Sequence, residues 1–330
     1  LSGGCLEADL IERAARVRES GEAEIVSYDG RAGEDLMWGL GIGCNGFLEI
    51  LLEPQSATRA GSLGTLLAHA LDEPRPSVLA TVMRASGSGA PCVGARALVR
   101  TRSDVARDGE WGRSGVIHAV IADALSSQPS ERRGMNLEYV DDSVVAQVVF
   151  ELVRPSVSLV ICGSGPDAIP VVRLALSLGW DVTVVDPRPV AVLPPERFAG
   201  ARVVECARSE NLGDIISTNA RTAAVVMSHN YERDLDYFDV MTRSEVAYLG
   251  VLGPRARTER LFGDLEARGR SCKAAMRARI HAPIGLDVGG DGAEAIALSI
   301  IAEVSAVMHG HSATNLRESA ESIHESASLV

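Results

Sequence analysis

Apolar residues in the first 130 positions follow two different periods. Between residues 6 and 20 they recur every three or four positions, which is typical of an amphipathic helix, and similar spacing predicts helices over 62–71 and 116–125. Short apolar runs bounded by polar or turn residues predict strands at 23–28, 77–83 and 93–99, and the run FLEILLEP at 47–54 predicts a strand that is ended by Pro54. Residues 1–130 are therefore expected to form an N-terminal α/β domain.

Strands and helices alternate from residue 157 onward. The spacing of apolar residues predicts helices over 167–178 and 293–308. Apolar runs predict strands at 157–162, 181–185, 202–205, 222–227 and 247–251. Strands that alternate with helices form a parallel sheet with helices on both faces. The second half is therefore expected to be a doubly wound parallel α/β domain.

A polar segment at 126–136 separates the two patterns. Its sequence, SSQPSERRGMN, contains Pro and Gly and has no apolar period, as expected of a linker. The run at 138–152 follows it and is expected to be an edge element of the second domain. We therefore place the second domain at 131–310 and expect the Ser- and Glu-rich residues 311–330 to form a flexible tail.

Composition excludes several classes of protein. Acidic residues outnumber basic ones by 44 to 32, and the net charge of -12 disfavours a nucleic-acid or anionic-membrane surface, because both need a basic footprint. The sequence has no apolar run long enough for a membrane span and no secretory signal, although the absence of an initial Met leads us to expect residues upstream of Leu1. The six cysteines form no CxxC pair, which fits a reducing cytoplasm.

A glycine-rich turn follows directly after the apolar run at 157–162. Its sequence, GSGPDA, fits the pattern G-x-G-x-x-G/A of dinucleotide-binding domains. In that pattern Gly163 permits the tight turn, Gly165 lets a phosphate approach the backbone, and Ala168 allows the helix to pack closely on the strand. The turn predicts a Rossmann-like domain with a phosphorylated ligand at the start of the helix. The alternative is a structural turn without a ligand.

Two acidic residues near this turn are candidates for ligand contact. Asp186 ends the next strand, 21 residues after Gly165, where an acidic residue commonly binds a ribose hydroxyl. Asp167 is unusual, because a carboxylate at the start of a helix repels an anion, although it would be an ordinary helix cap. We therefore count both residues among the candidate cofactor contacts.

Two cysteines lie in glycine-rich loops. Cys44 follows Gly43 in the segment GLGIGCNG, where the glycines allow close approach of a large ligand. Cys5 follows two glycines at the start of the first helix, a position that lowers the pKa of a thiol. A thiolate suits sulfur transfer or molybdenum contact, whereas the alternative for either residue is a small buried side chain. The other four cysteines are expected to be structural: Cys92, Cys162, Cys206 and Cys272.

Three further candidates follow predicted strands or lie near the far end of the sheet. His229 follows the strand at 222–227, and Arg255 follows the strand at 247–251. Ligands bind at the carboxyl edge of open α/β sheets, and a guanidinium there can clamp a phosphate. His281 begins the segment HAPIGLD, in which Pro and Gly fix a loop. Structural roles in loops or at a helix start are the alternatives.

These motifs together resemble the XdhC/CoxI family. The matching segments follow the family's order along nearly the whole chain and lie at 2–7, 39–54, 160–189, 225–234, 248–261 and 280–303. Two residues depart from the family's pattern. Asn45 stands where Gly is common after the cysteine, and Asn230 stands where an acidic residue is common after the His.

The resemblance implies an accessory protein of a molybdoenzyme of the xanthine dehydrogenase or CO dehydrogenase type. Such a protein binds molybdenum cofactor (molybdopterin) as cargo, protects it while a cysteine desulfurase-type partner supplies sulfur, and delivers it to the apo-molybdoenzyme. It also implies a cytoplasmic homodimer and a contact from Cys44, with Cys5 as a second candidate, to the sulfur or molybdenum of the cargo. The residues expected to contact the cofactor are Gly43, Gly163, Gly165, Asp167, Asp186, His229, Arg255 and His281.

Two other functions stay open at this point. A NAD(P)-dependent oxidoreductase would use the same glycine turn and convert a substrate, whereas an interaction protein would leave the turn empty. The chain has no iron–sulfur cysteine cluster and is too short for a complete xanthine dehydrogenase. A cofactor chaperone is therefore favoured over a catalyst, which would be an oxidoreductase.

Overall fold

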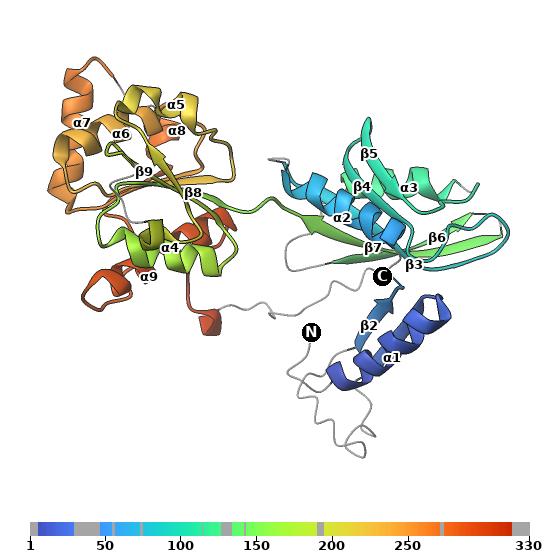
Figure 1. Ribbon diagram of the computed structural model, residues 1–330. Coiled ribbons are helices and arrows are strands. Elements are labelled where there is room, and N and C mark those ends of the chain that lie inside the picture. The colour runs from blue at the N-terminus through green and yellow to red at the C-terminus, as the bar shows by residue number, and fades with distance from the viewer. Residues whose placement is uncertain are drawn as a thin grey trace. The chain divides into compact units, whose positions relative to one another are not determined.

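The chain divides into two compact units between Arg154 and Pro155 (Figure 1). The computed structural model describes residues 6–29, 47–54, 57–72, 75–113, 115–126, 134–141, 143–189, 195–270 and 274–318. Cys5, Gly43 and Cys44 lie outside these residues, as does the end of the expected tail at 319–330. Within the described segments no helix is long and apolar enough to cross a membrane.

The first unit is built on a five-stranded antiparallel sheet with the order β5-β4-β3-β7-β6. Its strands are β3 (Ser77–Ser86), β4 (Arg96–Thr101), β5 (Asp104–Asp108), β6 (Met135–Asp141) and β7 (Val144–Val153). Helices α2 (Ala57–Asp72) and α3 (Val116–Ser126) contribute to separate hydrophobic clusters with this sheet. Val78 and Ala80 of β3 pack in the α3 cluster, whereas Leu79 packs in the α2 cluster. Both faces of this strand are therefore buried.

A smaller α/β element forms the start of the first unit. Strands β1 (Glu24–Asp29) and β2 (Phe47–Leu52) pair antiparallel, and helix α1 (Glu7–Ser20) precedes them. The helix ends where Gly21 adopts a left-handed conformation with φ of 73° and donates its N–H to Val17. The predicted N-terminal α/β arrangement is therefore confirmed.

The boundary between the units lies later than the sequence pattern indicated. Strand β7 pairs with β3 on one side and β6 on the other, so residues 135–153 complete the antiparallel sheet of the first unit. The run expected at 138–152 as an edge element thus contains an interior strand. Val148 and Phe150 of that strand are fully buried. The division therefore falls at 154/155 and not at 130/131.

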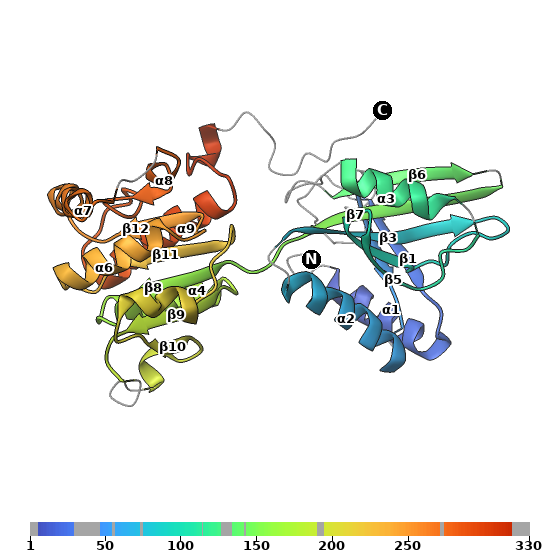
Figure 2. The ribbon, with the colours of Figure 1, turned by 90° about the horizontal axis from the view of Figure 1, so that it is seen from above.

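The second unit is built on a six-stranded parallel sheet with the order β10-β9-β8-β11-β12-β13 (Figure 2). The strands are β8 (Ser158–Cys162), β9 (Asp181–Asp186), β10 (Arg202–Glu205), β11 (Thr222–Val226), β12 (Tyr248–Val251) and β13 (Ile280–His281). The chain starts at β8, runs outward to β10, and returns to β11 on the other side of β8. This reversal creates a switch point between β8 and β11.

Helices cover both faces of the parallel sheet, which confirms the doubly wound α/β fold (Figure 1). One face carries α4 (Ala168–Ser177) and α9 (Ala293–Met308), and the other carries α5 (Leu212–Ile215), α6 (Tyr231–Thr242), α7 (Arg255–Ala267) and α8 (Ala274–Arg277). Among the described residues of this unit, 3₁₀ helices lie at Pro195–Phe198, Ser209–Asn211 and Leu316–Glu318.

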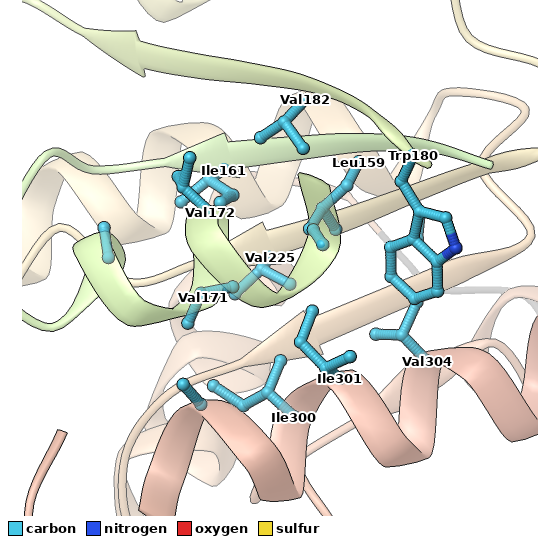
Figure 3. Close-up of a cluster of buried hydrophobic side chains, with 14 of the residues drawn as sticks. Leu159, Ile161, Val171, Val172, Trp180, Val182, Val225, Ile300, Ile301 and Val304 are labelled. Atoms are coloured by element: carbon cyan, nitrogen blue, oxygen red, sulfur yellow. The ribbon is translucent and has the colours of Figure 1, made fainter. Parts of the chain in front are cut away.

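Aliphatic side chains fill the core between the sheet, α4 and α9 (Figure 3). Val171 and Val172 of α4 and Ile300 of α9 meet Leu159 and Ile161 of β8 there. Each such side chain contributes about 1.5–3 kcal/mol when fully buried. This packing fixes the start of α4 against the end of β8 and so positions the glycine turn between them.

Candidate functional site

The candidate site lies at the carboxyl edge of the parallel sheet, at the switch point. The ends of β8 and β11 are neighbours, and Met227 N donates a 2.9 Å hydrogen bond to the carbonyl oxygen of Cys162. The glycine turn after β8 and the loop 228–230 after β11 are therefore adjacent. Ligands in open α/β sheets bind at this position.

Gly163 allows these two loops to approach each other closely. Its φ is 131°, and a Cβ at this position would lie 2.6 Å from Met227 O and 2.7 Å from Ser228 Cα. Gly163 N also donates a 2.9 Å hydrogen bond to Val185 O of the neighbouring strand. The tight turn expected of this glycine is thus required by the backbone packing.

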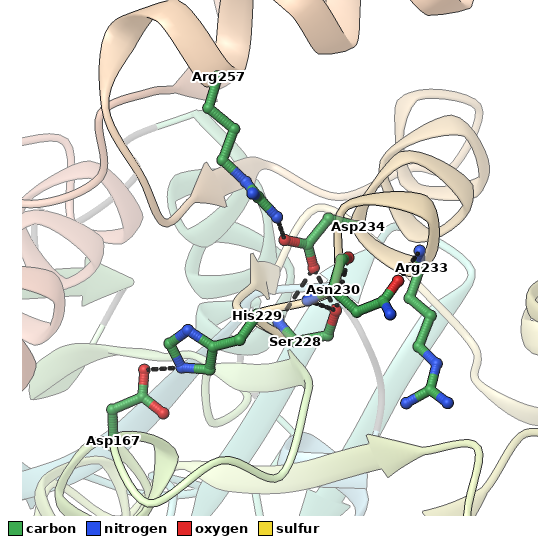
Figure 4. Close-up of polar contacts among 7 residues, drawn as sticks. All are labelled: Asp167, Ser228, His229, Asn230, Arg233, Asp234 and Arg257. Atoms are coloured by element: carbon green, nitrogen blue, oxygen red, sulfur yellow. Dashed lines mark hydrogen bonds and ion pairs between the residues drawn. The ribbon is translucent and has the colours of Figure 1, made fainter.

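The side chains of Asp167 and His229 meet beside Gly165 (Figure 4). His229 Nε2 lies 2.7 Å from Asp167 Oδ2, so the imidazole can donate a hydrogen bond to the carboxylate. The Asp167 side chain is 16% exposed, whereas that of His229 is 57% exposed. The site therefore presents an imidazole to solvent, with a carboxylate bonded behind it.

A buried carboxylate holds the loop that carries His229 (Figure 4). Asp234 Oδ1 accepts hydrogen bonds from Ser228 N at 3.0 Å and Ser228 Oγ at 2.5 Å, and Arg257 Nη2 lies 2.6 Å from Asp234 Oδ2. Asp234 is only 1% exposed. These bonds fix the residue before His229, which itself adopts a left-handed backbone conformation with φ of 59°.

Asn230 caps the helix that follows this loop. Its Oδ1 accepts a 3.1 Å hydrogen bond from the backbone N–H of Arg233, which satisfies one of the free donors at the start of α6. The amide thus supplies the acceptor that an acidic residue would supply at this position. The departure from the family's pattern at Asn230 therefore leaves the helix cap intact.

Asp186 has partners from two segments at the next strand end. Ser164 Oγ donates to its carboxylate, and Arg188 donates from its backbone N–H at 2.9 Å and from Nε at 2.8 Å. Burial opposes ionisation of Asp186, but the hydrogen bonds from Arg188 and Ser164 outweigh it and lower the pKa of the carboxyl group. A ribose hydroxyl would therefore have to share or replace bonds that this carboxylate already makes.

Two predicted site residues are not in contact with this cluster. Arg255 is exposed at the start of α7, and within the described part of the chain its side chain makes no hydrogen bond or ion pair. His281 stacks on the ring of Tyr248 with the centroids 4.4 Å apart, and its Nδ1 lies 3.2 Å from Glu303 Oε1 of α9. Burial opposes ionisation of Glu303, but bonds from His281, Tyr248 and the Gly285 N–H lower its pKa overall. These contacts give His281 a structural setting between β12, β13 and α9.

The described cysteines do not form a metal-binding cluster. Cys162 and Cys206 are buried, and burial raises the pKa of both thiols, whereas Cys92 is exposed. Among the residues with a described position, no three His, Cys, Asp or Glu side chains are grouped so that they could hold a metal ion. The predicted contacts of Cys44, Gly43 and Cys5 lie outside the described residues.

A surface depression of about 490 Å³ lies elsewhere in the second unit. Its lining includes Ser217 and Thr218, which precede β11, and Ser244 and Glu245, which precede β12. These residues belong to the amino edge of the sheet, opposite the glycine turn. The depression is therefore separate from the candidate site.

Sequence reasoning missed three polar residues that build the site. Arg188 and Ser164 form hydrogen bonds with Asp186. The signals available in the sequence were the position of Arg188, two residues after the end of β9, and that of Ser164 inside the glycine turn. Asp234 lies in the charged segment YERDLDYF, which is hard to distinguish from a solvated helix face. Its burial becomes evident only when α6 is packed against the sheet.

The strand order and the glycine turn at the switch point define the second unit as a Rossmann domain. Residues 159–304 match the family model of the XdhC Rossmann domain. The resemblance predicted from the sequence motifs is thereby confirmed.

Two relatives and a solved structure extend the similarity. The chain is 26% identical over 306 residues to a probable xanthine dehydrogenase subunit of Bacillus subtilis, covering 92% of this chain and 82% of that protein. It is 26% identical over 147 residues to "Uncharacterized protein YqeB" of Escherichia coli, covering 44% of this chain and 26% of that protein. A crystal structure described as a xanthine dehydrogenase from Bacillus halodurans shares the fold. It has a TM-score of 0.69 and 24% identity, and the match covers 97% of this chain and 84% of that one.

Proposed function

We propose that this protein binds molybdenum cofactor as cargo and delivers it to a xanthine dehydrogenase-type molybdoenzyme. The observation that carries the proposal is the XdhC-type Rossmann domain, whose glycine turn lies at the switch point with Asp167 and His229 beside it. The name of the B. subtilis relative, which refers to a xanthine dehydrogenase, supports the choice of partner. On this proposal the protein is a chaperone without turnover of its own.

The carboxyl edge offers the cargo several kinds of contact. The imidazole of His229 is 57% exposed and the guanidinium-bearing side chain of Arg188 is 53% exposed. Arg255 adds an exposed cation at the start of α7. A phosphorylated pterin carries an anionic group and ring hydrogen-bonding atoms, which such groups suit. We therefore place the cargo at this edge and retain Gly163, Gly165, Asp167, Asp186 and His281 as proposed contacts.

The glycine-rich cysteine segments supply the remaining part of the proposal. Cys44, next to Gly43, is proposed to contact the molybdenum or its sulfur, with Cys5 as a second thiol. A cysteine desulfurase-type donor supplies the sulfur while the cargo is held, and the apo-molybdoenzyme then receives it. The protein is proposed to act in the cytoplasm as a homodimer.

Retention of the pterin tests the proposal. Molybdenum cofactor released under anaerobic conditions is mixed with the full chain, the mixture is desalted, and the retained pterin is oxidised and measured by its fluorescence. Wild type is expected to retain pterin, and Gly165→Asp to lose it, because a Cβ at Gly165 would lie 2.5 Å from Asp167 Oδ1. Cys44→Ala is measured in the same assay, to test whether the thiol of Cys44 contributes to retention of the pterin.

A matched control separates a local effect from a general one. Gly263→Asp introduces the same side chain in α7, where nothing lies within 4 Å of the added Cβ, and it should retain pterin like wild type. A wild-type protein that retains no pterin but binds NADH and converts a substrate would replace the carrier proposal with the NAD(P)-dependent oxidoreductase.

A further inference from the structure

The space beside Gly165 is already filled by side chains of this chain. A Cβ at Gly165 would lie 2.5 Å from Asp167 Oδ1, 3.1 Å from His229 Cδ2 and 3.3 Å from His229 Nε2. In a dinucleotide-binding turn, the second glycine leaves room for the pyrophosphate to approach the backbone. Here that room holds the hydrogen-bonded pair of Asp167 and His229 (Figure 4).

The carboxylate of Asp167 also opposes a pyrophosphate. Asp167 immediately precedes α4, where the helix dipole would otherwise favour an anion. Its carboxylate places a negative charge at that position, and among the described residues nothing donates a hydrogen bond to its buried Oδ1. An incoming phosphate would therefore meet a like charge as well as an occupied volume.

The pair is held in place by the surrounding structure. The Asp167 side chain is mostly buried, and its Oδ2 lies 2.7 Å from His229 Nε2. The neighbours of His229 are fixed in turn, because Ser228 bonds Asp234 and Asn230 caps α6. Clearing the space beside Gly165 therefore requires the mostly buried Asp167 side chain to move as well as the exposed imidazole of His229.

We propose that Asp167, positioned by His229, is a specificity-determining residue that excludes the pyrophosphate of a dinucleotide from the glycine turn. This inference rests on the proposed function, which places the cargo at this edge. It adds to that function the class of ligand that the turn excludes, the dinucleotides. The cargo is then held here without a pyrophosphate on the turn. Gly165 leaves room for the Asp167–His229 pair rather than for the pyrophosphate of a dinucleotide.

Binding of NADH to the full chain tests this proposal, with titration followed by nucleotide fluorescence or calorimetry. Wild type is expected to bind NADH weakly. Asp167→Asn removes the charge and keeps the volume, whereas Asp167→Ala removes both. The affinity for NADH should therefore rise from wild type to Asp167→Asn and again to Asp167→Ala. The rise for Asp167→Ala should be roughly tenfold or more, because a like-charge contact is relieved. Asp181→Ala removes the same charge at the exposed amino end of β9 and should bind as wild type does.

Two results would overturn the exclusion. One is an NADH affinity that stays unchanged or falls in Asp167→Ala while the melting temperature shows that the variant is folded. The other is a rise of equal size in Asp181→Ala, which would show that net charge alone is responsible. Pterin retention by the same wild-type preparation decides the proposed function separately, because it does not depend on the response of NADH affinity to Asp167.

Discussion

At the scale of single residues, alanine substitutions at two glycines with a positive φ separate the cost of a steric clash from the cost of the backbone conformation. Gly163→Ala is expected to destabilise the protein by about 3 kcal/mol or more, because strain at a positive φ costs about 1–3 kcal/mol and the added Cβ would also lie 2.6 Å from Met227 O. Gly179→Ala is the control, since its φ is 73° but nothing lies within 4 Å, and it should cost about 1 kcal/mol. Urea unfolding of both variants measures the difference, and equal losses would show that the close approach is unimportant.

The lowered pKa of Asp186 predicts how its contribution to stability depends on pH. Because the folded-state pKa lies below the ordinary value of 3.8, the stabilisation is complete above that value and is lost as the pH falls through the folded-state pKa. Asp186→Asn should therefore be less stable than wild type at pH 7, by about 1–3 kcal/mol, and the gap should narrow toward pH 3. Urea unfolding at several pH values checks this. A gap that stays constant with pH would contradict it, and Asp181→Asn is the matched control.

The meeting of the glycine turn with His229 could be predicted from the sequence, but the contents of the space beside Gly165 could not. Both segments follow buried parallel strands, and such strands end at one edge of the sheet. The position of the imidazole depends on the left-handed backbone of His229, which is uncommon for a residue other than glycine. Arg255 also follows a strand and His281 ends one, yet their side chains have different surroundings because orientation and burial decide contact.

At the scale of elements, the cap of α6 predicts different losses of stability for two substitutions of the same residue. Asn230→Ala removes the acceptor for the Arg233 N–H and should cost about 1 kcal/mol, whereas Asn230→Asp keeps an acceptor and should have little effect. Thermal unfolding of both variants measures the outcome. Equal losses would mean that the amide acts through some contact other than the cap.

Helix α9 was predicted well, whereas the two-residue strand β13 was not. The helix expected over 293–308 agrees with α9, because a helix of 16 residues repeats the helical period several times. Strand β13 has only two residues, Ile280 and His281, which are too few for any pattern. Its place at the end of the sheet depends on pairing with β12, a long-range contact that local periodicity cannot reveal.

At the scale of the whole molecule, the sequence predicted two α/β parts but placed the division too early. The segment 126–136 has the composition of a linker, whereas the division at 154/155 follows directly after β7. Linker composition shows where the chain tolerates a loop, but it does not show which sheet the next strands join. Strand β7 pairs with the edge of β3 that lies opposite β4, and apolar residues of the two strands share one buried cluster. Strands β6 and β7 therefore join the first unit.

Shortened chains test which boundary is correct. A fragment of residues 155–318 contains the whole parallel sheet with its helices, so it should unfold cooperatively and remain unaggregated. A fragment of 131–318 adds β6 and β7 without β3, which would expose Val148 and Phe150 to solvent and leave an unpaired strand edge. We expect it to aggregate more at equal concentration, as measured by light scattering on a sizing column. If the longer fragment is the better behaved of the two, β6 and β7 belong with the Rossmann domain and the division at 154/155 is refuted.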